Sequence, residues 1–408
     1  GSRGPSTWQP HLFLPQVERM EAAGDGPYFA PPTEWCFKPC TNPDLTTPYS
    51  SKNHRWREDD ERIDSRIRHF FLDLPFRVQS DDSKWVPVLN GDVLGGGEAL
   101  AASPGLRIFK QRIVSAPDGN TIPISVMIPD SACPSNLLPC VVYCHGGGTS
   151  HYSCFYNNFQ TLGRLLAHAG AVVVMPDFRN TAAPSLRGEE IGPFPAGLND
   201  CASAARWAHE HLGELCASHV VIAGESGGGN LAISATLSMH RADERMIRGV
   251  YVLCPMLRGL WGGEGEDHEA SSWNRNAGIF MDYPEKKQLD KGYGMGSPDR
   301  DWALHAERNA LAWPGLYADP LELRRLGFPP TAVVVNEFDP LLDDGVGFHR
   351  TCMEAELPGC SLQNLPGTTH GVGSYLVNLI PEISKDQCRR IVDFAREQNL
   401  HVGKREGM

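Results

Sequence analysis

The feature that most constrains the fold of this chain is a serine framed by glycines, between an apolar run and a helix-like stretch. The serine is Ser226, the apolar run is 219–223, and Gly224 and Gly228 lie two residues before and after the serine. A serine between a strand end and a helix start needs a strained backbone, and small residues at these two places let the chain fold back without a clash. The context therefore predicts that Ser226 is a nucleophile beside the free N–H groups of a helix. The alternative is a glycine-rich turn whose serine only caps the helix.

A second glycine run lies upstream of this turn. Residues 138–144 have the pattern of a buried strand, and they lead directly into His-Gly-Gly-Gly at 145–148. Glycines at a strand end leave the backbone free to turn its N–H groups toward a ligand. One N–H after the serine is too little to hold a tetrahedral oxyanion, so a neighbouring loop must supply more donors. The two motifs in this order favour acyl chemistry over a flexible loop with a satisfied histidine.

Together these motifs resemble the hormone-sensitive-lipase-like branch of the α/β-hydrolases. That branch includes microbial carboxylesterases, arylacetamide-deacetylase-like enzymes and plant carboxylesterases. The segments similar to its HGGG, GDSAGGNLA, DPLxDxG and HGF motifs are 145–148, 224–232, 339–345 and 370–372. The resemblance covers about residues 105 to 400 and implies an α/β-hydrolase fold with a serine mechanism.

The resemblance also implies which backbone groups hold the oxyanion. By motif position these are the N–H groups of Gly147, Gly148 and Gly227. The chain departs from the family pattern in three places, one of which is the family's Tyr-Arg-Leu-Ala-Pro-Glu run, poorly kept at 179–184. Glu225 replaces the usual Asp or Thr, and Gly227 replaces the usual Ala after the nucleophile, which keeps the N–H but loosens the turn. These departures bear on substrate and rate more than on the class of reaction.

The acid of such a site should follow a strand, since the chain order in this fold is serine, acid, histidine. The run 331–335 is strongly β-branched, and Asp339 follows it. Ligand sites gather at the carboxyl ends of strands in open α/β sheets, so we predict Asp339 as the acid. Its rivals Asp343 and Asp344 lie deeper in the following turn, where we expect them to cap the next helix.

Three histidines lie beyond that acid. His349 falls in a helical stretch, 345–356, and His401 lies in the polar tail. His370 follows a predicted last strand, 361–365, in a loop. A loop histidine can place its ring between a serine and a carboxylate, so we predict His370 as the base.

The remaining pattern predicts the fold. Strand-like and helix-like stretches alternate between residues 141 and 254, which is typical of a mostly parallel sheet covered by helices. A hairpin of 107–114 and 121–128 precedes them. We therefore expect an α/β fold of the α/β-hydrolase type, with a mostly parallel central sheet flanked by helices and a helical cap.

The domain boundaries follow from where this alternation starts and stops. The predicted catalytic domain comprises 106–255 and 329–408, interrupted by an insertion over 256–328 and preceded by an extension over 1–105. In the family such segments form a cap over the active site. The alternative for the insertion is a surface excursion with its own small core.

Aromatic side chains near the predicted loops are candidates for the substrate pocket. We predict that Tyr152, Phe155 and Trp273 line it, although aromatic residues in a cap more often pack than touch substrate. The proposed chemistry needs no metal ion and no organic cofactor, so none is expected.

Composition limits the partners. The net charge of −12 argues against a nucleic-acid partner and against an anionic membrane surface. No apolar run is long enough to span a membrane, and twelve cysteines in 408 residues are too few for a disulfide scaffold. No signal-peptide pattern and no Asn-x-Ser/Thr site occur, which favours a cytoplasmic protein. The sequence leaves a homodimer open.

The predicted function is hydrolysis of small-molecule carboxylic esters by a serine carboxylesterase through an acyl-enzyme, with bulky, aryl or acetyl esters as candidate substrates. Two alternatives remain. An amidase or acyltransferase would use the same three residues, since only the fate of the acyl-enzyme differs. A non-catalytic binder of small ligands could also use this fold, although such binders usually lose the histidine that is present here at 370.

Overall fold

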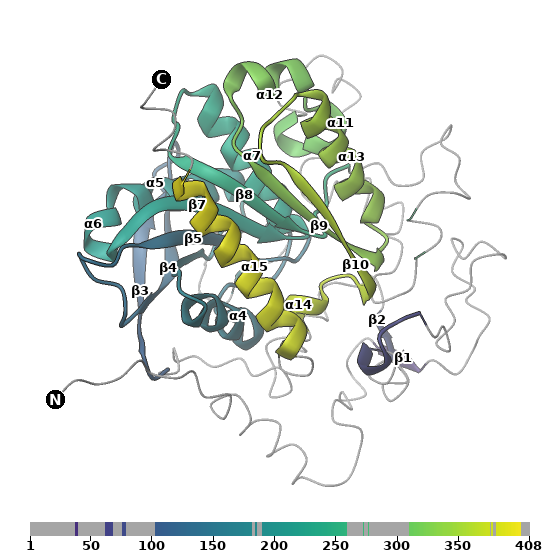
Figure 1. The fold of residues 1–408 in the computed structure, drawn as a ribbon, viewed down its shortest axis with the longest axis horizontal. Coiled ribbons are helices and arrows are strands. Elements are labelled where there is room, and N and C mark those ends of the chain that lie inside the picture. The colour runs from purple at the N-terminus through teal and green to yellow at the C-terminus, as the bar shows by residue number, and fades with distance from the viewer. Residues whose placement is uncertain are drawn as a thin grey trace, which may run out of the picture.

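A computed structural model of the chain shows one large sheet covered on both faces by helices (Figure 1). The structure describes residues 103–258 and 310–400, apart from 182–183, 186–189, 376 and 378–380, together with 37–39, 62–67, 76–78, Ser272 and Asn276. The short strands β1 (Phe37–Pro39) and β2 (Phe76–Val78) pair with each other in a separate antiparallel ribbon.

The large sheet has eight strands in the spatial order β10-β9-β8-β7-β5-β6-β4-β3. Their bounds are β3 Leu106–Val114, β4 Thr121–Pro129, β5 Leu138–Cys144, β6 Val172–Pro176, β7 Ala217–Glu225, β8 Ile247–Leu253, β9 Thr331–Phe338 and β10 Ser361–Thr369. Strand β4 pairs antiparallel with both β3 and β6, and every other pairing in this sheet is parallel. The predicted hairpin and the mostly parallel sheet are thereby confirmed.

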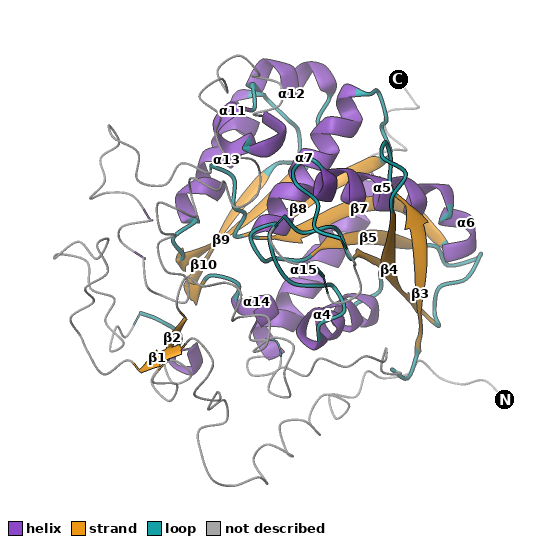
Figure 2. Cartoon of the chain, turned by 180° about the vertical axis from the view of Figure 1, so that it is seen from behind, coloured by secondary structure: helices purple, strands orange, loops and turns teal. Residues whose placement is uncertain are grey.

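Helices cover both faces of the sheet. Their bounds are α4 Asn157–His168, α5 Ala196–Glu210, α6 Leu212–Leu215, α7 Gly227–Arg241, α11 Pro314–Tyr317, α12 Pro320–Leu326, α13 Leu342–Glu354, α14 Val372–Tyr375 and α15 Pro381–Leu400. Helices α4, α14 and α15 lie in front of the sheet in Figure 1, and α5 and α7 lie in front of it in the reverse view of Figure 2. Helix α13 contacts β9, and α12 contacts α7 and α13. None of the described helices is both long and apolar enough to cross a bilayer.

The central strands are largely apolar because both of their faces are covered. Along β5, Val142 and Cys144 pack with the core on the α5 and α7 side, while Val141 and Tyr143 pack with the core on the α4 and α15 side. This alternation follows from the two-residue period of a strand. The central strands therefore form a buried layer between the two sets of helices.

Most of the predicted extension (1–105) and most of the predicted insertion (256–328) lie outside the described residues, so the cap stays a prediction. The last part of the insertion is described and belongs to the main body. Helices α11 and α12 contact α7 and α13, and Trp313 and Leu323 are buried in the core on that face.

Candidate active site

Ser226 lies in a sharp turn between β7 and α7. Its backbone has φ of 54° and ψ of −121°, a conformation that costs an ordinary residue about 1–3 kcal/mol. The neighbouring glycines permit it by close approach. A Cβ on Gly224 would collide with the carbonyl oxygen of Gly228, and one on Gly228 would collide with the carbonyl oxygens of Cys144 and His145. Only glycine fits at these two positions, so the backbone of the turn determines the position of the serine side chain.

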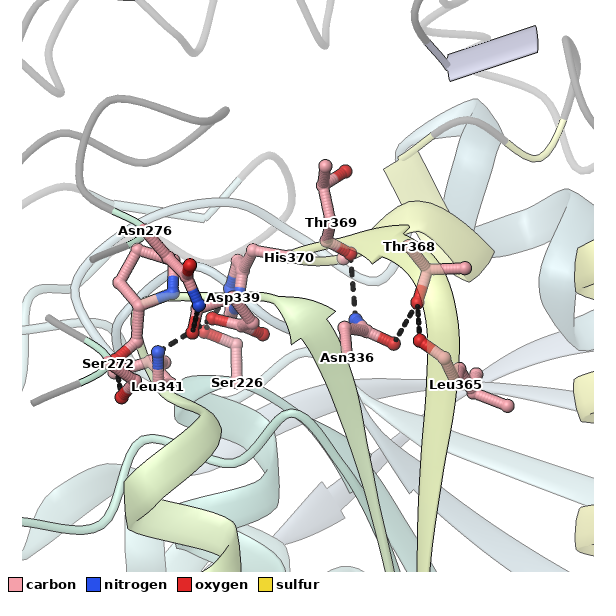
Figure 3. Close-up of polar contacts among 12 residues, drawn as sticks. Ser226, Ser272, Asn276, Asn336, Asp339, Leu341, Leu365, Thr368, Thr369 and His370 are labelled. Carbon is pink, nitrogen blue, oxygen red and sulfur yellow. Dashed lines mark hydrogen bonds and ion pairs between the residues drawn. The ribbon is translucent and has the colours of Figure 1, made fainter. Parts of the chain in front are cut away.

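The structure brings the three predicted side chains of the nucleophile, base and acid together (Figure 3). The Nε2 atom of His370 lies 3.1 Å from the Oγ atom of Ser226, and its Nδ1 atom lies 2.8 Å from the Oδ2 atom of Asp339. All three residues are buried. They come from the carboxyl ends of β7, β9 and β10, which lie at one edge of the sheet.

Asp339 sets the electrostatics of the ring. Burial lowers the pKa of His370, but the charge of Asp339 and its hydrogen bond outweigh burial, and the pKa ends well above that of an ordinary histidine. The other oxygen of Asp339, Oδ1, accepts the N–H of Leu341 at 2.7 Å. The carboxylate is therefore fixed on both sides and favours the imidazolium form of the ring.

Cys254, directly after β8, is a site residue that the sequence analysis missed. Ligand-type atoms of Cys254, Asp339 and His370 lie within 4.8 Å of one another. Burial raises the pKa of this thiol to about 11, whereas a metal ligand must be a thiolate. The Nδ1 atom of His370 and the Oδ2 atom of Asp339 are already hydrogen-bonded to each other. The trio therefore fits a hydrogen-bonded acid–base pair better than a metal centre. The sequence feature that could have identified Cys254 is its position at the end of a strand, beside the predicted acid.

The loop after β5 lies against the start of α7. Gly147, Gly148 and Thr149 all have positive φ, at 116°, 61° and 62°. Within the part of the chain that the structure describes, no hydrogen bond uses the N–H groups of Gly147, Gly148 or Gly227. A Cβ on Gly227 would lie 2.5 Å from the nitrogen of Thr149. Glycine at 227 therefore lets this loop approach the turn more closely than the usual alanine would.

His145, the first residue after β5, helps to hold that loop in place. Its ring stacks on Phe178 with centroids 4.2 Å apart and also packs against Phe159. Burial lowers the pKa of His145 to about 4, so the ring is neutral at physiological pH. Its Nδ1 atom lies 2.7 Å from the carbonyl oxygen of Gly146 and, as an N–H, donates to it. His145 therefore holds the glycine run in place rather than taking part in proton transfer.

The loop that carries His370 is held by side chains from β9. The amide of Asn336 donates to the carbonyl oxygen of Thr369 at 2.7 Å, and its oxygen accepts the hydroxyl of Thr368 at 3.0 Å (Figure 3). On the acid side, the Asn276 amide donates to the Asp339 carbonyl oxygen at 3.0 Å. The predicted base and acid are thus positioned by polar side chains.

The two rival carboxylates do not cap the following helix, contrary to the sequence-based expectation. Helix α13 has no side-chain cap at its start. Instead, Asp344 accepts the N–H groups of Leu257 and Arg258, at 2.8 and 2.9 Å. Asp343 accepts the N–H of Ser272 at 2.7 Å. Both tie the segment after β8 to α13, a long-range contact that no local pattern indicates.

The predicted pocket residues have separate outcomes. Tyr152 and Phe155 are buried in the core on the α4 side, and Tyr152 packs against the glycine loop, where a Cβ on Gly147 would lie 2.5 Å from its ring. Trp273 lies outside the described residues. A contact of any of the three with substrate stays a prediction.

Comparison with known families places most of the chain in one family. Residues 141–374 match the model of a family described as having the alpha/beta hydrolase fold. Carboxylesterase NlhH from Mycobacterium tuberculosis is 30% identical over 313 residues, which cover 73% of this chain and 85% of that protein.

Solved structures give the same result in three dimensions. The structure of esterase Est22 with p-nitrophenol matches with a TM-score of 0.68 and 34% identity, and covers 83% of this chain and 98% of that one. Brefeldin A esterase, a bacterial homologue of human hormone-sensitive lipase, matches with a TM-score of 0.67 and 30% identity, over 83% of this chain and 95% of that one.

Proposed function

We propose a Ser226–His370–Asp339 mechanism for this chain, which belongs to the α/β-hydrolase family and, within it, to the hormone-sensitive-lipase-like carboxylesterases. The chain is a carboxylic ester hydrolase. The observation that carries the assignment of roles is the continuous hydrogen-bonded chain from Ser226 through His370 to Asp339, at 3.1 and 2.8 Å.

Each residue has a distinct role in the proposed reaction. His370 takes the proton of Ser226 as the serine oxygen attacks the ester carbonyl. Asp339 orients the ring and stabilises the imidazolium, which then gives its proton to the departing alcohol. Water activated by the neutral ring frees the acid from the acyl-enzyme.

The developing oxyanion is held by backbone groups in this proposal. The N–H groups of Gly147, Gly148 and Gly227 have no acceptor among the described residues, and their loops adjoin the serine. Losing one donor of an oxyanion hole typically costs about 100- to 1000-fold in rate. The positive φ angles of Gly147 and Gly148 support the assignment, because they let successive N–H groups turn toward one point.

We propose small-molecule carboxylic esters as the substrate class, with bulky, aryl or acetyl esters as the first to test. Two similar structures support this: one relative is named for brefeldin A, and another was solved with p-nitrophenol. We also keep a cytoplasmic location as a proposal, supported by the ten described cysteines, which are free thiols. A homodimer is testable by light scattering.

The test is hydrolysis of a chain-length panel of p-nitrophenyl esters by the wild type and by Ser226→Ala. We expect turnover by the wild type and a loss of about 10⁵- to 10⁶-fold in the variant. Ser218→Ala, at the opposite end of the same strand, is the matched control and should keep wild-type turnover. Equal rates for wild type and Ser226→Ala would overturn the assignment. Faster transfer to added alcohols or amines than to water would favour an acyltransferase.

A further inference from the structure

A buried carboxyl group lies beside the nucleophile and has no part in the mechanism above. Glu225 ends β7, directly before Ser226, and its side chain is 1% exposed. Its Oε1 atom has no hydrogen-bond partner among the described residues. A buried carboxyl group in this state is costly to keep, so its position calls for a physical reason.

Three segments of the site meet at this carboxyl group. A Cβ on Gly146, in the loop after β5, would lie 3.0 Å from its Oε1 atom, and one on Gly371, beside the base, would lie 3.3 Å from it. Ser374, in the first turn after the base loop, lowers the pKa of this carboxyl group through its hydroxyl. Glu225 therefore lies between the glycine loop and the base loop.

We propose that Glu225 is a positioning residue of the site: its carboxylate holds the base loop through Ser374 and favours the protonated ring of His370 during the reaction. The proposal rests on the proposed roles of Ser226 and His370. It adds a second acid to the site, which acts through the ring and the loop and does not touch the substrate.

The Ser374 hydroxyl links the charge of Glu225 to the base. It donates to the carbonyl oxygen of Gly371 at 3.3 Å, and it also lowers the pKa of the Glu225 carboxyl group. A hydroxyl has one proton to donate, and an ionised carboxylate is the stronger acceptor. When Glu225 is ionised, the hydroxyl therefore turns to it and joins α14 to the nucleophile turn.

The groups that face Glu225 leave few charges to compete with this effect. Burial raises the pKa values of Tyr143 on β5, Tyr375 on α14 and Cys254 after β8, so these stay neutral. The charged neighbours are His370, which lowers the pKa of Glu225, and Asp339, which raises it. With burial as the largest cause, the pKa of Glu225 is raised to about 7. The attraction is mutual, so an anion at Glu225 favours the imidazolium.

The experiment compares Glu225→Gln, which keeps the shape, with Glu225→Asp, which keeps the charge. We measure kcat and the pH profile of kcat/KM on a p-nitrophenyl ester. His370 must be neutral to act as a base, so loss of the anion should move the acid limb to lower pH. We expect Glu225→Gln to lower kcat about 10-fold and to move the limb down by about 0.5 to 1 pH unit. Glu225→Asp should restore the limb toward its wild-type position.

The control is Glu354→Gln on the exposed face of α13, which changes the net charge equally and should leave the limb in place. A lower kcat with an unmoved limb in Glu225→Gln would indicate packing alone and would overturn the proposal, as would a wild-type profile. If Glu225→Gln does not fold, Ser374→Ala carries the test, with an expected loss of several-fold in kcat. An unchanged kcat in a folded Ser374→Ala would also overturn it. Absence of Ser226-dependent turnover in the wild type would instead contradict the proposed function.

Discussion

The proposed nucleophile and the proposed base are positioned by different physical means. Ser226 is fixed by backbone geometry: its N–H donates to Leu253 at 2.9 Å, and the glycines two residues on either side admit no side chain. His370 is fixed by side chains, with Asp339 on its ring and Asn336 on the residue before it. From this difference we expect a single added methyl group in the nucleophile turn to abolish most of the activity. Loss of one side chain that holds the base loop should lower the activity only in part.

Among the residues that position the proposed nucleophile and base, the proposed acid should give the largest effect. Asp339→Asn should lower kcat by about 10⁴-fold, because the amide no longer stabilises the imidazolium and favours the wrong tautomer. The wild-type acid limb of kcat/KM should lie above about 6.5, the ordinary histidine value, because Asp339 raises the pKa of His370. In the variant burial dominates, so the limb should move to lower pH.

Measurements of kcat and of kcat/KM as a function of pH check this prediction. The matched control is Asp393→Asn, an exposed carboxylate on α15, which should keep the wild-type profile. An acid limb that stays in place in Asp339→Asn would mean that another group sets the pKa of the base.

The next largest effect tests the nucleophile turn, which is fixed by its backbone. Gly228→Ala should lower kcat by about 1000-fold and destabilise the fold by about 3 kcal/mol or more, since its Cβ would meet the carbonyl oxygens of Cys144 and His145 at the end of β5. Gly213→Ala is the matched control, because a Cβ there meets nothing within 4 Å. Ester turnover and thermal unfolding measure both quantities. Near-wild-type activity in Gly228→Ala would remove the distinction between the two regions.

The smallest effect tests the side-chain region. Asn336→Ala should lower kcat about 10-fold and destabilise the fold by about 1–3 kcal/mol, because it leaves the Thr369 carbonyl oxygen and the Thr368 hydroxyl with fewer partners. Asn364→Ala, exposed on the neighbouring β10, is the control and should change neither. A loss of kcat and stability as large as that of Gly228→Ala would show that the base loop is as sensitive to substitution as the nucleophile turn.

The parts of the candidate site that depend on local sequence could be predicted. Ser226 stands in a strand–turn–helix pattern with its own glycines, and chain order then leaves one acid and one loop histidine in suitable places. The fold could be predicted for a similar reason, since each buried strand of a parallel sheet is a continuous apolar run. The parallel sheet and its leading hairpin are confirmed.

The parts that depend on long-range contacts could not be predicted. The local sequence predicts that Asp344 caps a helix, but its carboxylate accepts N–H groups 86 and 87 residues away. Cys254 carries no motif, and it meets the acid and base only because β8 lies between β7 and β9. The sequence marked Glu225 as unusual, but its burial between two loops depends on how the strands assemble.

The central claim is that Ser226 is the nucleophile and that His370 activates it. Peptide mass spectrometry after treatment with a serine-reactive organophosphonate tests this most directly. We predict one adduct, on the peptide that contains Ser226, formed at least about 100-fold more slowly in a folded His370→Ala variant. An adduct on another residue, or equal labelling rates with and without His370, would contradict the account.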